Sequence, residues 1–145
     1  MPTSRDPDLS LFFDILYTID AERGEKADLI PLTMGSRYRL AFRHRVQQLV
    51  DLPNGDTFPM WCARPEDVIV GKLMAWEEGR SRKHETDIYE MLVFHYLALD
   101  PELSAAFDED YITRRAVQLG GDVVEFWQAV TRRARAEAER QGAQR

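Results

Sequence analysis

Cysteine is almost absent from this chain, since Cys62 is the single one among 145 residues. An internal disulfide is therefore excluded, and the composition suits a reducing compartment, where we expect Cys62 to be a small buried residue on a strand. Long apolar runs are missing as well, so the sequence predicts neither a membrane span nor a secretory signal. Together these absences favour a cytoplasmic protein that has no contact with a membrane.

Positive charge and metal-binding side chains are also scarce. The 19 Lys and Arg residues are outnumbered by 25 Asp and Glu residues, and the net charge of −6 argues against general affinity for nucleic acid. The three histidines, His44, His84 and His95, lie far from one another and from Cys62 in the sequence, so no zinc site is indicated. No Ser/His/Asp or Cys/His nucleophile arrangement is suggested either. Binding of phosphate groups would have to come from a local basic patch.

What the chain does contain is enough apolar material for a core. A length of 145 residues with 44% hydrophobic content is most simply one domain. We predict an α+β fold in which residues 12–62 form a small antiparallel or mixed sheet that packs with a helical part at 63–140. The polar stretches 1–10 and 135–145 are expected to be weakly ordered tails.

Two hairpins are predicted in the first half. Residues 12–19 alternate as a strand, a turn contains Gly24, and the return strand 26–32 places Asp28 between apolar neighbours. Such an acid is either held rigidly for a site or is an ordinary solvent-facing residue opposite Asp14 or Thr18. After a short helix at 37–44, strands at 46–52 and 57–62 flank Asn54-Gly55, which is typical of a hairpin turn.

The stretch 63–93 is predicted to be two helices joined by a basic elbow. Pro65 suits the first turn of a helix, apolar residues recur at helical spacing, and Gly79 ends the helix. Glu66 and Asp67 place negative charge on the first turn, where the helix dipole favours it. We expect Lys72 on the first helix to meet Asp87 on the second. The elbow between the helices holds Arg80, Arg82, Lys83 and His84.

The rest of the chain is predicted to be helical. Ser104 or Asp108 can cap a short helix that runs through Leu119, and Gly120-Gly121 breaks it. Asp122 with Glu125 resembles a capping box at the start of a last helix. The apolar stripe of that helix, which indicates core or partner contact, contains Val123, Phe126, Trp127, Val130 and Ala134.

The order of charged residues in 63–93 resembles the second half of nucleotidyltransferase-fold domains of the AbiEii toxin type. The resemblance extends back to about Phe12, and it implies that Asp28 is the third active-site carboxylate of that family, where it would bind a metal ion or position the attacking hydroxyl. It further implies that magnesium and a nucleoside triphosphate are the cofactor and substrate. The matching residues are Pro65-Glu66-Asp67-Val68-Ile69, Lys72-Leu73, the basic stretch Arg80 to His84, and Asp87-Ile88.

The resemblance also assigns roles to the basic residues. Lys72, Arg80, Arg82 and Lys83 would bind phosphates, and Asp87 would orient Lys72. On this reading Asp28, Lys72 and Asp87 are the catalytic residues.

The chain departs from the family at the paired acids that hold two magnesium ions. Asp6-Pro7-Asp8 imitates the pair, but proline interrupts it, and Asp-Pro favours a turn-forming or disordered N-terminus instead. A single carboxylate leaves a magnesium–triphosphate complex held mainly by water, so impaired catalysis is expected. Three explanations remain open: a reduced domain that binds without turnover, a first motif supplied by another chain, or action of Asp6 and Asp8 despite Pro7.

The sequence therefore predicts a nucleotidyltransferase-like protein of toxin–antitoxin or defence type that binds a nucleotide or another anion and is impaired in catalysis. If active, it is a magnesium-dependent nucleotidyltransferase. The alternative is a non-catalytic interaction or assembly module with a vestigial site, in which the elbow is a solvated charge run and Lys72–Asp87 a surface ion pair. A domain without the opening strand of the fold exposes an edge at its first hairpin, which predicts a homodimer or a partner encoded by a neighbouring gene.

Overall fold

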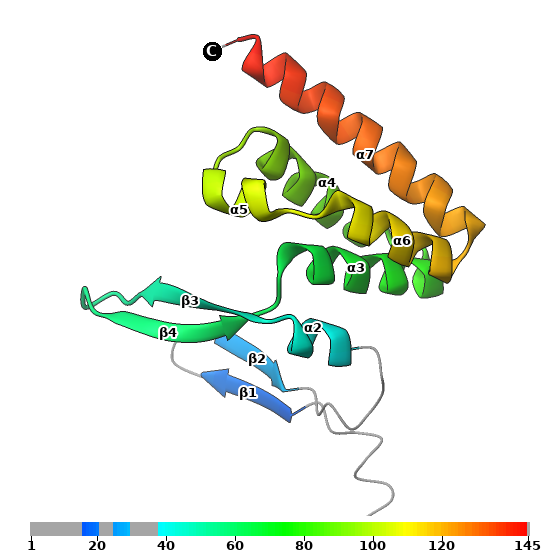
Figure 1. Ribbon diagram of the computed structural model, residues 1–145. Helices are drawn as coiled ribbons and strands as arrows, with labels where there is room; N and C mark the ends of the chain where they lie inside the picture. Colours follow the sequence, from blue (N-terminus) through cyan, green and yellow to red (C-terminus); the bar gives the residue numbers. More distant parts are fainter. Residues whose placement is uncertain (1–15, 21–24, 30–37, 145) are drawn as a thin grey trace, which may run out of the picture. The chain divides into compact units, whose positions relative to one another are not determined.

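The computed structural model describes residues 16–20, 25–29 and 38–144, with the first two ranges described by their backbone. Contacts divide the chain into two compact units, of which the first ends at Leu40 and the second begins at Ala41. The prediction of a single domain remains a prediction. The α+β class is confirmed, because antiparallel strand pairs precede a C-terminal half made of helices (Figure 1).

The first unit contains the predicted hairpin. Strand β1 (Leu16–Asp20) pairs antiparallel with β2 (Glu25–Leu29). The register places Asp28 opposite Tyr17, and not opposite Asp14 or Thr18 as one of its two interpretations had it. The predicted extensions of these strands, to residue 12 and to residue 32, lie outside the described residues.

The second hairpin follows the short helix α2 (Arg39–Arg43) and consists of β3 (Val46–Asp51) and β4 (Thr57–Cys62). Its turn uses Gly55 as predicted: the Gly55 amide donates to the Leu52 carbonyl at 2.9 Å, and Gly55 has φ 88°, a conformation that glycine adopts without strain. Cys62 lies on a strand as expected, but it is half-buried instead of buried, because it ends β4.

Five helices follow: α3 (Pro65–Gly79), α4 (Arg82–Tyr96), α5 (Pro101–Ala106), α6 (Glu109–Leu119) and α7 (Gly121–Gly142). Carboxylates cap two of them, since Asp100 accepts from the Leu103 amide and Asp108 accepts from the Tyr111 amide at 2.8 Å. Helix α7 continues through the stretch predicted to be weakly anchored, and Ala138 is buried there. None of the helices in the described ranges combines the length and the apolar content of a membrane span.

Four of these helices, α3, α4, α6 and α7, form the core (Figure 1). The predicted stripes are confirmed at Ile69 and Leu73 of α3 and Trp127 of α7, which are fully or almost fully buried, whereas the predicted members Trp76 and Phe126 are half-buried against the core. Trp127 also donates from Nε1 to Thr113 Oγ1 at 2.9 Å, so its polar atom is satisfied inside the core. The other fully buried apolar members are Ile88, Leu92, Ile112, Ala116, Val123, Val130 and Ala134.

Two helix boundaries differ from the prediction. The elbow is short: Ser81 caps α4, so Arg82, Lys83 and His84 form the first turn of that helix instead of a loop. The capping box at Asp122 does not form, since α7 begins after Gly120 without a side-chain cap and Asp122 pairs with Arg80. Asp122 thus binds a distant residue through Oδ2, while its Oδ1 accepts from the adjacent Val123 amide at 3.0 Å.

Candidate anion site

The predicted contact between Lys72 and Asp87 is present. Lys72 Nζ lies 2.6 Å from Asp87 Oδ2, and the pair joins α3 to α4. The side chains are 27% and 29% exposed, so solvent reaches both. The hydrogen bond from Lys72 holds the pKa of Asp87 below its usual range, against the opposing effect of partial burial. Asp87 is therefore a carboxylate that can orient the Lys72 ammonium.

Two further side chains belong to this patch. Lys83 and His84 precede Asp87 on α4 at i,i+4 and i,i+3 spacing, so their side chains are its neighbours on the helix surface, and their charges help to lower the pKa of Asp87. Both lie in the first turn of α4, where the helix dipole favours an anion, and their backbone amides donate to Ser81. We call Lys72, Lys83, His84 and Asp87 the Lys72–Asp87 patch. Its His84 Nδ1 is buried without a hydrogen-bond partner among the described residues.

The other predicted phosphate ligands have different surroundings. Arg80 is in the left-handed region at φ 52°, its guanidinium lies 4.3 Å from the Trp76 ring centroid, and it forms an ion pair with Asp122 of α7. An anion would have to compete with Asp122 for this arginine. Arg82 is exposed at the start of α4, where its carbonyl accepts from Thr86. Lys72 and Lys83 are thus the cations that the structure gathers around Asp87.

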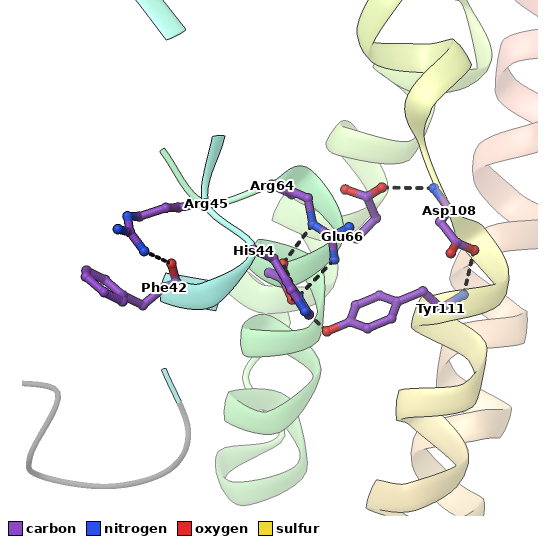
Figure 2. A network of polar contacts seen from close by, with 8 residues as sticks. Phe42, His44, Arg45, Arg64, Glu66, Asp108 and Tyr111 are labelled. Atoms are coloured by element: carbon purple, nitrogen blue, oxygen red, sulfur yellow. Dashed lines mark hydrogen bonds and ion pairs between the residues drawn. The ribbon is translucent and has the colours of Figure 1, made fainter. Parts of the chain in front are cut away.

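A second polar cluster, which sequence reasoning missed, is centred on Asp67, and Figure 2 labels the residues around it, His44, Arg64 and Tyr111. The Asp67 carboxylate is 3% exposed and accepts hydrogen bonds from Arg64 Nε at 3.1 Å and from the Tyr111 hydroxyl at 2.6 Å. His44 Nδ1 lies 3.3 Å from the same carboxylate and 3.1 Å from Arg64. Burial, followed by the hydrogen bond to Asp67, raises the pKa of Tyr111 to about 12. Asp67 therefore joins the starts of α3 and β3 to α6.

Glu66 makes a similar connection. It is 3% exposed, and its Oε1 accepts from the backbone amide of Asp108 at 2.9 Å (Figure 2). The sequence had assigned Glu66 and Asp67 only to the helix dipole. The signal that could have found their further role was their place in the Pro-Glu-Asp motif, since two acids beside buried apolar positions require partners.

The predicted magnesium ligands were compared with the side chains that the structure describes. No group of three or more His, Cys, Asp or Glu side chains that could hold a metal ion occurs within 38–144. Asp6 and Asp8 lie outside the described residues, and Asp28 is described by its backbone only, on β2. Asp28 belongs to the first unit, whereas Lys72 and Asp87 belong to the second, and their shared catalytic site stays a prediction.

Comparisons with protein-family models, curated proteins and solved structures gave no match to this chain.

Proposed function

We propose that this protein is nucleotidyltransferase-like, of toxin–antitoxin or defence type, and that it binds a nucleotide or another phosphate-bearing anion at the Lys72–Asp87 patch in the cytoplasm. The observation that supports this proposal is the 2.6 Å contact by which Asp87 orients Lys72 beside the first turn of α4. A fixed ammonium near the positive end of a helix dipole is a suitable receptor for phosphate oxygens. The order of residues that resembles AbiEii-type domains adds the expectation that the phosphate belongs to a nucleotide.

Catalysis is proposed to be impaired. Asp87 is engaged by Lys72, and the described residues offer no set of carboxylates for magnesium. If turnover occurs, carboxylates outside the described side chains must hold the metal ion, and Asp28, Asp6 and Asp8 are the candidates. The chain would then be a magnesium-dependent nucleotidyltransferase whose substrate is a nucleoside triphosphate.

The alternative function is that of a protein-interaction module, and one observation favours it. The β3–β4 hairpin carries large apolar side chains in solvent: Leu49 is 70% exposed, Trp61 58% and Phe58 54%. Clustered apolar exposure of this kind marks interaction sites. The partner is then a second copy of the chain or a protein encoded by a neighbouring gene, while membranes and nucleic acid in general are not proposed as partners.

Calorimetric titration with each nucleoside triphosphate, with and without magnesium, tests the main proposal. We expect saturable binding that Lys72→Ala weakens by about tenfold to a hundredfold, because a charge-assisted hydrogen bond is lost. Arg140→Ala is the matched control, since Arg140 is an exposed cation on α7 that pairs with Glu137. It should leave the affinity unchanged.

The outcomes separate the two functions. If Lys72→Ala and Arg140→Ala weaken nucleotide binding equally, the nucleotide is held by general attraction between charges. If no nucleotide binds, the Lys72–Asp87 patch is vestigial. Binding that persists in Asp28→Asn but no longer depends on magnesium would assign Asp28 to the metal and leave the patch as the phosphate receptor.

A further inference from the structure

The hydrogen bonds of the β3–β4 hairpin determine which backbone groups point outward. The Leu52 amide donates to the Asp56 carbonyl at 2.8 Å, so Leu52 and Asp56 are a hydrogen-bonded pair. Hydrogen-bonded and non-hydrogen-bonded pairs alternate along an antiparallel ladder. In the observed register the non-hydrogen-bonded pairs are Asp51 with Thr57, Leu49 with Pro59 and Gln47 with Trp61. The amides and carbonyls of these residues point away from the hairpin.

The two outer edges differ because of one proline. Pro59 is at an outward-pointing position in the middle of β4, where it removes the central donor of that edge. The edge of β3 keeps all its donors, on Gln47, Leu49 and Asp51, and these residues are exposed. Proline on an edge strand is a common obstacle to pairing with another strand. Only the β3 edge is thus suited to accept a further strand.

The hairpin also has a reason to gain a strand. A two-stranded hairpin is marginally stable in water, and a third strand or a packed face is needed for independent stability. Both faces of this one carry exposed apolar side chains: Phe58 and Met60 on one face, Leu49 and Trp61 on the other. A longer sheet would bring these side chains next to new neighbours and remove apolar area from water.

We propose that two copies of the chain pair through the outer edge of β3, antiparallel, to form a four-stranded sheet. The proposal sharpens the interaction function and does not depend on nucleotide binding. With a two-fold axis at Leu49, the outward amides and carbonyls of β3 in each copy bond to those of β3 in the other copy. It places Leu49 against Leu49 of the partner subunit and Gln47 against the partner's Asp51, so that an amide donor faces a carboxylate. A shift of this register by two residues would place Gln47 against the partner's Leu49 in one direction and beyond the end of the partner's β3 in the other.

Sedimentation equilibrium of the full chain tests the dimer and its edge. The wild type should have twice the monomer mass of 16.8 kDa. Leu49→Pro removes an outward donor from β3 but none from the hairpin, so it should raise the dimer dissociation constant at least about tenfold, with one donor lost from each copy. Thr57→Pro is the matched control, because it places proline at an outward position on the β4 edge. It should leave the dimer intact.

A charge swap tests the register and does not use proline. Gln47→Glu should weaken the dimer, because the new carboxylate faces the partner's Asp51, and addition of Asp51→Lys should restore it. A wild type that remains monomeric at every concentration overturns the proposal. So does a dimer with equal sensitivity to Leu49→Pro and Thr57→Pro. Lys72→Ala should not affect the dimer, which keeps this result separate from the test of nucleotide binding.

Discussion

Lys72 of α3 and Asp87 of α4 meet at 2.6 Å, although 15 positions separate them in the sequence. The contact crosses the short connection between the two helices, and solvent reaches both side chains. It is the best-defined part of the proposed anion site, and it makes Asp87 the carboxylate whose titration reports on that site.

The pKa of Asp87 should be measurably below 3.8, because Lys72 donates a hydrogen bond to the charged form. Carbon-detected NMR titration of the carboxyl group measures it. Lys72→Met should move the pKa of Asp87 upward. The ion pair adds to the free energy of unfolding at pH values above the pKa of Asp87 in the unfolded chain. This contribution is lost as the pH falls through the lower pKa of Asp87 in the folded protein. An unchanged Asp87 pKa in Lys72→Met would contradict the contact.

Tyr111 and Asp67 should be energetically coupled. Tyr111→Phe removes the 2.6 Å hydrogen bond to the buried carboxylate and should lower the free energy of unfolding by about 1–2 kcal/mol. In a double-mutant cycle with Asp67→Asn, measured by urea unfolding, the two losses should not add. Phe substitution of Tyr38, which is exposed, is the control and should have little effect. Additive losses of stability would show that the Tyr111 hydroxyl stabilises the protein through a contact other than the one with Asp67.

His95 should make the protein less stable in mild acid. Burial between Tyr96 and Phe107 lowers the pKa of His95 below 6.5, although Glu109 and Glu66 oppose this effect and Arg135 adds to it. The unfolded chain therefore binds more protons just below pH 6.5, so the free energy of unfolding decreases as the pH falls through that range. Urea unfolding at pH 7.5 and 5.5 should show a smaller decrease in His95→Leu than in the wild type. Equal decreases would rule out a contribution from His95.

Arg80 occupies a backbone conformation that favours glycine. Its φ of 52° is left-handed, and a Cβ atom in that region is unfavourable. Arg80→Gly and Arg80→Ala both lose the contacts with Asp122 and Trp76, so their difference isolates the backbone. We expect the Gly variant to be more stable than the Ala variant by about 1 kcal/mol in urea unfolding. The reverse order would contradict the left-handed conformation.

Local signals were sufficient for much of the fold. Asn54-Gly55 predicted the second hairpin, and Pro65 with Gly79 predicted both ends of α3, because turn chemistry and helix termini depend on residues close in sequence. The meeting of Lys72 with Asp87 was also predictable, since a short connection leaves adjacent antiparallel helices few ways to pack. Local signals failed at Asp122, which resembled a cap and instead pairs with Arg80, 42 positions away.

The sequence by itself determined the class of the fold, the helical stripes and the pair at the proposed site. Only the tertiary structure decided that Asp67 is buried with Tyr111, 44 positions away, that Arg80 turns toward α7, and that Pro59 lies opposite Leu49 in the second hairpin. The physical reason is the distance along the chain over which each kind of interaction acts. Periodicity and turn residues act within a few positions, whereas the partner of a buried carboxylate is chosen by how the helices pack.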